Sequence, residues 1–257
     1  MSDRAEAQLH NMMEQAAAHV PRQPPDLEGK MGAFYKSFMD EARVDRLGAK
    51  PIVPQLADVR AAKSRDDFAA LMGRNASDFE GTVFSFGIDV DLKDPKRYAV
   101  YVGQSGLGLP DRDCYFKAEF DVQKKKYQAC AAQLLRLLDW PDADVRAADI
   151  VDLESKIARA SWSKAQQRDP VATYNPMSIS DLQKYARGFA WTAFLRDAGV
   201  ARVARVIVAE KTAFPKIAAV FAFRSWCGVE GRPDLSTRRG RLLVRAEAST
   251  PLACQTS

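Results

Sequence analysis

Histidine is the scarcest of the side chains that could carry catalytic chemistry in this sequence. The only histidines are His10 and His19. A helical zinc site of the form H-E-x-x-H needs two histidines four residues apart, so that both imidazoles lie on one face. His10 and His19 are nine residues apart, with no glutamate in the required place. We therefore expect two solvated or lightly packed histidines and no metal ligand in this chain.

Nucleophilic catalysis needs a base beside the nucleophile, and the same two histidines are the only imidazoles available for it. No G-x-S-x-G elbow occurs. Cys114, beside Asp113 and Tyr115, is the strongest candidate for a reactive thiol, although a structural role is the commoner one. No pair of the four cysteines has C-x-x-C spacing. We predict no catalytic, cofactor-binding or metal-binding residue.

The glycines of Gly103–Gly108 superficially match a phosphate-binding loop. The segment lacks the G-K-[ST] ending, and the strand predicted before it belongs to a hairpin rather than to a βαβ unit. Turn geometry that requires positive φ is the better interpretation. Just downstream, Asp111 and Asp113 are close enough to chelate a cation, but helix capping and pairing with Arg112 are commoner uses of such residues. We expect this segment to be structural.

The composition is that of a globular protein with a sizeable core: 257 residues, 47% hydrophobic and 28% charged. No apolar run approaches the roughly 18 residues of a membrane span, and the polar N-terminus does not read as a signal peptide. The net charge is +5, and residues 223–257 hold six arginines against three acidic residues. We interpret Lys124–Lys126 as a solvated helix face and expect no nucleic-acid partner.

Hydrophobic periodicity predicts a mainly helical chain, because apolar residues recur at steps of three and four along most of it. Ser64 with Asp67 forms a capping-box pattern, and Ser178 with Asp181 marks another helix start. Pro215 is expected to kink or bound the last helix. The predicted helices span residues 5–20, 28–44, 55–62, 117–139, 143–166, 191–198 and 200–222, with one more after each of the two caps.

One stretch has the alternating pattern of a strand instead. Apolar residues occupy every second position from Phe84 to Leu92 and again from Tyr98 to Val102. We predict a β-hairpin over about 82–104 with its turn at 93–96, and expect it to pack against the helices because a lone hairpin is marginal in water. The predicted fold class is mainly α: a multi-helix domain with one inserted hairpin.

Three blocks of this sequence resemble the neprilysin and endothelin-converting enzyme family of zinc metallopeptidases. Residues 103–115, GQSGLGLPDRDCY, are similar to the family's Q-x-G-L-G-L-P-x-R-D-Y-Y and depart at Cys114, where an aromatic is usual. Residues 152–177 hold L-E-x-x-I-A, then R-D-P and Y-N-x-M. Residues 32–51 look like the bacterial members. The blocks follow the family order over roughly residues 5–222.

The resemblance implies the N-terminal part of a two-lobed, mainly helical peptidase. In this family the C-terminal half supplies H-E-x-x-H, a downstream E-x-x-x-D and a further histidine, and the two lobes enclose a chamber that admits peptides. None of those motifs occurs here, so no catalytic residue is carried over. Zinc and peptide substrates are expected only with the missing half. Full-length members are exported or membrane-anchored, whereas this chain shows no such segment, so its compartment stays open.

The resemblance fades after Phe221. We predict that residues 1–222 form an incomplete N-terminal helical domain and that residues 223–257 are an irregular tail. The tail lacks lysine and is rich in arginine, as a shifted reading frame in a GC-rich gene would be, which leads us to expect a truncated product. Resequencing the locus tests this, because an intact frame without a downstream H-E-x-x-H region would contradict it.

A second class of function is a helical module that binds a peptide or a partner without any catalytic half. Co-purification with a separately encoded zinc-binding half would favour it. Under either function, we expect apolar surface that another part of a longer protein would cover.

Overall fold

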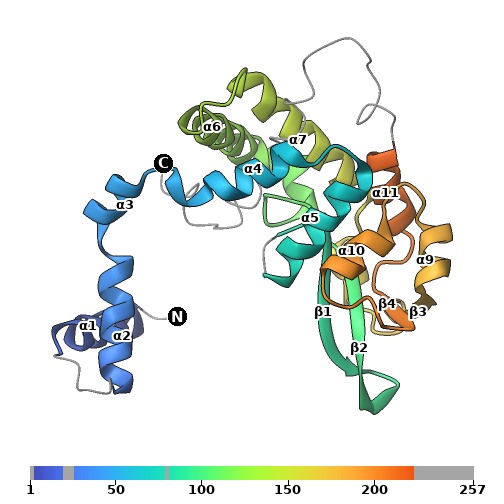
Figure 1. The fold of residues 1–257 in the computed structure, drawn as a ribbon, viewed down its shortest axis with the longest axis horizontal. Helices are drawn as coiled ribbons and strands as arrows, with labels where there is room; N and C mark the ends of the chain where they lie inside the picture. The colour runs from blue at the N-terminus through green and yellow to red at the C-terminus, as the bar shows by residue number, and fades with distance from the viewer. Residues whose placement is uncertain (1–2, 20–25, 79–80, 223–257) are drawn as a thin grey trace. The chain divides into compact units, whose positions relative to one another are not determined.

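The structure is a computed structural model that describes residues 3–19, 26–78 and 81–222. It divides into two compact units, one from Met1 to Val53 and one from Pro54 onward, and each is described by itself (Figure 1). Residues 21–25, whose three prolines predict a linker, lie outside the described residues, as does the predicted tail at 223–257.

The first unit is a helical hairpin followed by short helices. Its elements are α1 (Asp3–Ala18), α2 (Leu27–Phe38), α3 (Glu41–Leu47) and a 3-10 turn at Lys50–Ile52. Helices α1 and α2 approach closely at Gly32, where a side chain would overlap the carbonyl of Ala16. A glycine at the crossing therefore lets the two backbones touch.

The helix predicted over 28–44 is wrong as a single element, because it divides into α2 and α3. Asp40 lies between them, and its carboxylate accepts a hydrogen bond from the backbone N–H of Arg43 at 2.9 Å. An aspartate at this position satisfies a free amide of the next helix and so favours a new start over continuation. Gly48, which ends α3, has a positive φ of 50°, as expected for a helix end.

The second unit combines helices with a small sheet. Its helices are α4 (Val53–Ala61), α5 (Arg65–Ser77), α6 (Asp121–Leu137), α7 (Ala143–Ala160), α8 (Lys164–Gln167), α9 (Ile179–Tyr185), α10 (Trp191–Asp197) and α11 (Phe214–Ala222), with 3-10 turns at Arg112–Tyr115 and Ala118–Phe120. Its strands are β1 (Phe84–Asp91), β2 (Asp94–Gln104), β3 (Asn175–Ser178) and β4 (Arg205–Val208). The mainly helical fold class and both predicted caps, at Ser64 and Ser178, are confirmed.

The sheet has the order β1-β2-β4-β3. The predicted hairpin is confirmed as β1 and β2, which pair antiparallel. The turn predicted at 93–96 is wrong, because Asp91 pairs with Asp94 and only residues 92–93 lie between the strands. Strand β4 runs parallel to β2 with Val100 opposite Val206, and β3 closes the other edge antiparallel to β4. The helix predicted over 200–222 is therefore wrong in its first half, because the β-branched run Val206–Val208 is fully buried in the sheet.

One other predicted helix is corrected. The helix predicted over 143–166 ends at Ala160, and a separate α8 begins after Ser163, whose hydroxyl accepts the N–H of Gln166 in a capping box. Pro215 bounds the last helix, one of the two predicted alternatives. It is the second residue of α11, a position where its missing N–H costs no helical hydrogen bond.

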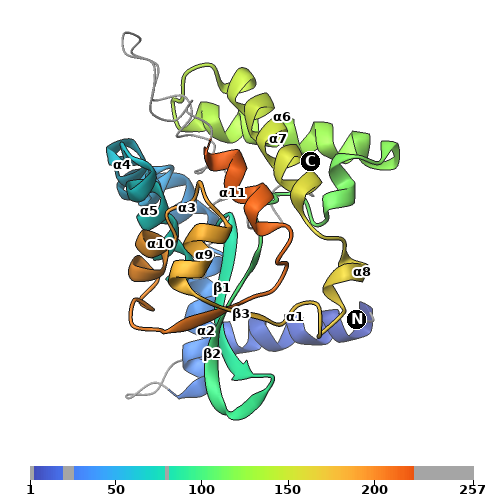
Figure 2. The ribbon, with the colours of Figure 1, turned by 90° about the vertical axis from the view of Figure 1, so that its right-hand side faces the viewer.

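The core of the second unit is an aromatic cluster between the sheet and the helices. Phe84 of β1 contacts Trp191 and Phe214, with ring centroids 4.5 and 4.9 Å away. Trp191 stacks on Phe214 with the rings inclined by only 13°, and its indole N–H donates to the carbonyl of Ala186. The base of the hairpin is thus held by packing, as expected, and α11 lies beside α7 on this core (Figure 2).

Helices α5 and α10 pack against each other at Gly73, and this contact can be tested. A side chain at Gly73 would overlap the carbonyl of Phe194, so Gly73→Ala is expected to lower the free energy of unfolding by about 1–3 kcal/mol. Gly87→Ala is the matched control, because nothing lies within 4 Å of a Cβ built there. Urea unfolding followed by circular dichroism measures both. Equal urea midpoints for the two variants would contradict the close packing of α5 against α10 at Gly73.

Candidate functional site

The candidate site is the segment from Gln104 to Tyr115, which leaves the end of β2 and leads to α6. Gln104 joins it to the residues after α7 through two hydrogen bonds. The backbone N–H of Trp162 donates to the Gln104 side-chain oxygen at 2.6 Å, and the Gln104 amide nitrogen donates to the Trp162 carbonyl at 2.9 Å. The Gln104 amide thus pairs with both main-chain groups of one residue, as a residue of a neighbouring strand would, and this holds the segment in place.

Glu210, which is 5% exposed, ties the same strand end to the loop after β4. One of its carboxylate oxygens accepts the backbone N–H of Gln104 at 2.7 Å, and the other accepts the side-chain amide of Gln167 at 2.8 Å. A buried carboxylate is tolerated only with such donors. The beginning of the site is therefore anchored to β4 and to α8.

Glu154 of α7 anchors the other end of the site. It is 2% exposed, and its carboxylate accepts the hydroxyls of Tyr115 at 2.6 Å and Tyr127 at 2.9 Å. The Tyr115 oxygen in turn accepts the backbone N–H of Leu109 at 3.0 Å. Burial and the neighbouring charge of Glu154 raise the pKa of Tyr115, so its hydroxyl stays protonated and remains a donor. Gly108 packs directly against the Tyr127 ring, leaving no room for a side chain.

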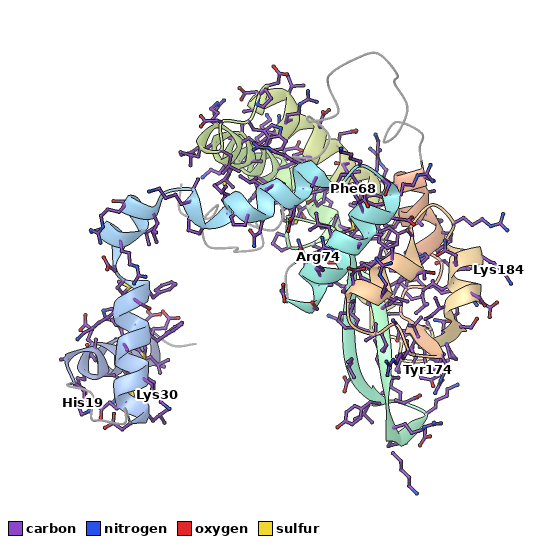
Figure 3. The ribbon with its side chains drawn as sticks, viewed as in Figure 1. His19, Lys30, Phe68, Arg74, Tyr174 and Lys184 are labelled. Atoms are coloured by element: carbon purple, nitrogen blue, oxygen red, sulfur yellow. The ribbon has the colours of Figure 1, made fainter. Side chains whose placement is uncertain are left out.

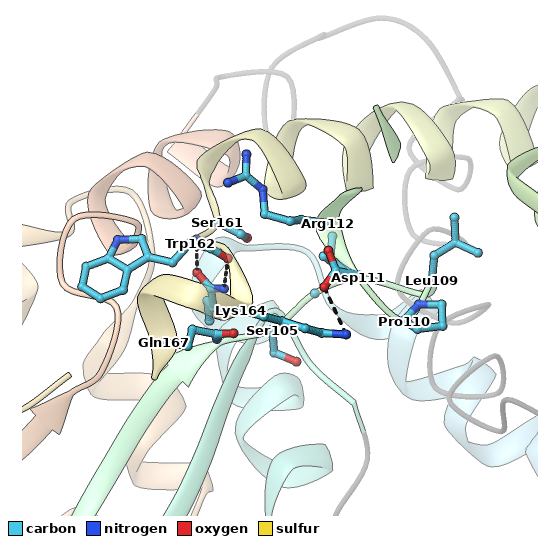
Figure 4. A pocket seen from close by; sticks show the side chains of 12 residues that line it. Ser105, Leu109, Pro110, Asp111, Arg112, Ser161, Trp162, Lys164 and Gln167 are labelled. Carbon is cyan, nitrogen blue, oxygen red and sulfur yellow. Dashed lines mark hydrogen bonds and ion pairs between the residues drawn. The ribbon is translucent and has the colours of Figure 1, made fainter. Parts of the chain in front are cut away.

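Between these anchors lies a polar pocket of about 180 Å³ (Figure 4). Asp111 and Lys164 form an ion pair across it at 3.1 Å. The backbone N–H of Asp113 donates to Asp111 at 2.8 Å, and this hydrogen bond, with Lys164, lowers the pKa of the Asp111 carboxyl. Ser161, also at the rim, donates its hydroxyl to the carbonyl of Ile157. Asp111 and Ser161 are thus engaged in contacts within the protein.

The structure places the predicted acidic pair in structural roles. Asp111 caps the 3-10 turn, as expected, but its ion-pair partner is Lys164, and that of Asp113 is Lys117 at 2.9 Å. The expected pairing with Arg112 is therefore wrong. The guanidinium of Arg112 instead lies over the ring of Phe116, 5.7 Å from its centroid, in the geometry of a cation–π contact.

The remaining sequence candidates have ordinary packing environments. Cys114 is 8% exposed and lies in a small apolar cluster with Tyr115 and Ala158, the setting of an inert cysteine. Gly106 has the predicted positive φ, 101°, whereas Gly103 belongs to β2 and Gly108 has no positive φ. The turn geometry is therefore confirmed at Gly106 only. Lys124 pairs with Asp121 at 3.2 Å.

Neither histidine reaches a converging set of metal donors in the described residues. The Nε2 atom of His19 (Figure 3) lies 3.3 Å from Asp26, while its Nδ1 atom lies 4.0 Å from Glu28. The two carboxylates therefore meet opposite edges of one ring. Over 3–19, 26–78 and 81–222, no group of three or more His, Cys, Asp and Glu side chains could hold a metal ion, so zinc does not fit the residues found there.

A third buried carboxylate, which sequence reasoning missed, lies at the end of the hairpin. Asp91 is 1% exposed and accepts hydrogen bonds from the hydroxyl of Tyr174 (labelled in Figure 3) at 2.7 Å, a guanidinium nitrogen of Arg205 at 2.6 Å and the backbone N–H of Lys93 at 3.0 Å. The Tyr174 and Lys93 hydrogen bonds, helped by Arg205, lower the pKa of Asp91. No local signal joins residues so distant in sequence.

Comparison with known proteins agrees with this architecture. Residues 1–226 match the model of peptidase family M13. The chain belongs to peptidase family M13. The chain represents the N-terminal region of such a zinc metallopeptidase. The resemblance seen in the three sequence blocks is confirmed. In the described residues, no helix is long and apolar enough to cross a membrane.

The M13 relatives are much longer than this chain. Endothelin-converting enzyme 1 of Cavia porcellus is 27% identical over 200 residues, which are 74% of this chain and 26% of that protein. Endothelin-converting enzyme-like 1 of Mus musculus is 27% identical over 177 residues, or 63% of this chain and 23% of that protein. The Mycobacterium tuberculosis zinc metalloprotease Zmp1, solved with an inhibitor, superposes with a TM-score of 0.78 at 26% identity, over 95% of this chain and 36% of that one.

Removal of the Glu154 carboxylate should lower the free energy of unfolding. Glu154→Leu leaves the buried hydroxyls of Tyr115 and Tyr127 without their acceptor, at a cost of about 1–3 kcal/mol for each. Glu119→Leu, at an exposed position, is the matched control and should change the stability little. Chemical unfolding of both variants measures the difference. A Glu154→Leu protein as stable as the control would contradict the stabilising role of the hydrogen bonds from Tyr115 and Tyr127 to Glu154.

The Asp91 anchor predicts a specific sensitivity to acid. Because the folded-state pKa of Asp91 is lowered, its contribution to stability is fully present above the pKa of an unfolded carboxyl and is lost as the pH falls through the lowered folded-state value. The natural chain should therefore lose more stability between about pH 5 and about pH 3 than Asp91→Asn does. Urea midpoints at both pH values, with Asp94→Asn as control, measure this. Equal losses of stability between the two pH values in all three proteins would exclude the stabilising role of ionised Asp91.

Proposed function

We propose that this chain is the non-catalytic N-terminal part of a zinc metallopeptidase that hydrolyses peptides, and that it is inactive alone. One observation carries the proposal. A sequence matched to family M13 over residues 1–226 contains only His10 and His19 among its 257 residues, and neither belongs to an H-E-x-x-H motif. Metal-assisted hydrolysis needs ligands that hold the ion and leave one position open for water.

The chemistry of the candidate site supports a structural role. Its buried carboxylates, Glu154 and Glu210, accept hydrogen bonds from side chains and backbone of neighbouring elements. Asp111 is held by Lys164. A general base must instead be within hydrogen-bond reach of the substrate proton that it abstracts. In our proposal these residues stiffen a wall of the peptidase, and the missing part holds zinc and the reacting peptide.

The domain organisation that we propose follows from the same argument. Residues 1–222 form an incomplete M13 N-terminal domain, and residues 223–257 are a separate tail that is not part of it. Peptide substrates are bound only when the remainder of a peptidase completes the chamber. Zmp1 is a zinc metalloprotease, and in our proposal that activity belongs to the full-length protein and not to this chain alone.

The direct test is the activity and metal content of the purified 257-residue chain. We expect no cleavage of an internally quenched peptide with or without added zinc, and far less than one zinc per chain by elemental mass spectrometry, because no described residues converge on a metal. An inactive result with an intact far-ultraviolet circular dichroism spectrum supports the proposal. Hydrolysis that a chelator abolishes and zinc restores would overturn it.

A further inference from the structure

The outer half of the β1–β2 hairpin presents large apolar side chains to solvent. Figures 1 and 2 both show this ribbon extending past the helices that surround its base. Exposed apolar side chains that gather on one ordered element are typical of a docking surface. We call this surface the tip face; its residues are Ile88, Val90, Leu92 and Tyr98, with exposed fractions of 61%, 40%, 62% and 77%.

The tip face continues the apolar face that forms the core. Directly opposed residues lie on the same side of an antiparallel pair, and the opposed pairs here are Phe86–Val102, Ile88–Val100 and Val90–Tyr98. Val102 is fully buried, whereas Tyr98 is mostly exposed. Strand β4 lies beside β2 in the same sheet only at residues 100–102. Val100 and Val102 belong to the buried core, whereas Ile88, Val90 and Tyr98 are exposed. The outer ribbon therefore continues the apolar alternation of the inner strands without the packing that buries their side chains.

The tip face is held in a fixed position. Asp91, beside the turn, is bound by Tyr174 before β3 and Arg205 of β4, and the ammonium of Lys93 lies 4.9 Å from the centre of the Tyr174 ring. A two-stranded ribbon would otherwise be marginal in water. These contacts hold the end of the hairpin to the sheet, so a partner would meet a surface that is already ordered.

Charged side chains accompany the tip face on the same ribbon. Lys93, Lys96 and Arg97 are exposed near the turn, and Asp89 is exposed on the opposite face of β1. An apolar centre that includes a tyrosine, with charged residues outside it, is the usual composition of a protein interface.

We infer that the tip face docks on an apolar patch of the part of a full-length M13 peptidase that this chain lacks. The inference rests on the proposed function. This chain covers 36% of the Zmp1 chain, so the larger part of such a protein has no counterpart here. A partner within the same polypeptide has a high effective concentration, and a small apolar face is then sufficient for stable contact.

The test combines the 257-residue chain with that missing part. The chain is produced in the same cells as a tagged segment of Zmp1 that begins where the match to this chain ends. Retention on the tag is measured together with hydroxyl-radical oxidation of Tyr98, read by mass spectrometry in the complex and in the chain alone. Ile88→Ser with Tyr98→Ser is the test variant, and Val145→Ser, at a 59% exposed position on α7, is the matched control. All the substituted side chains are exposed, and circular dichroism verifies folding.

We expect the unmodified chain and the control to be retained, oxidation of Tyr98 to fall several-fold in the complex, and the double variant to bind at least about tenfold more weakly. Equal oxidation of Tyr98 in both states, or equal retention of the double variant and the control, would overturn the inference alone. Failure of the unmodified chain to be retained would also overturn the inference, whereas the proposed function is overturned only by zinc-dependent hydrolysis by the isolated chain. A dimer of the isolated chain with Tyr98 already protected would assign the tip face to a second copy and also overturn the inference.

Discussion

Burial of a carboxylate among tyrosine hydroxyls is the interaction on which the candidate site depends. Glu154 is taken out of water, which is costly for a charge unless donors replace the lost solvent. Tyr115 and Tyr127 supply them, and each comes from a different element. One acidic side chain thereby joins α7, α6 and the segment before α6, and Tyr115 passes the constraint to the backbone of Leu109.

The same arrangement recurs at two other places in the second unit. Glu210 joins the end of β2 to α8, and Asp91 joins the hairpin turn to β3 and β4. In each case a buried acid accepts hydrogen bonds from elements far apart in sequence, and these hydrogen bonds hold the elements together.

The exposed apolar side chains of the outer hairpin differ from the aromatic core in having no second layer packed against them. The aromatic cluster of Phe84, Trp191 and Phe214 shows that this chain buries large side chains efficiently where it has two layers to do so. The outer hairpin has only one layer. Membership of family M13, with this chain spanning about a quarter of the relatives' sequences, gives a physical reason for a face left without its covering layer.

The sequence by itself determined the mainly helical class, the hairpin, the two caps, the turn at Gly106 and the family, since each depends on local periodicity or on a contiguous motif. It also established that the ligands for a helical zinc site are missing, because two histidines nine residues apart cannot form one. Only the tertiary structure decided that Val206–Val208 is a strand, since a short apolar run fits a helix or a buried strand equally until β2 lies beside it. It alone assigned Lys164 to Asp111 and Tyr174 to Asp91, because residue pairs 53 and 83 positions apart meet only when the chain has folded.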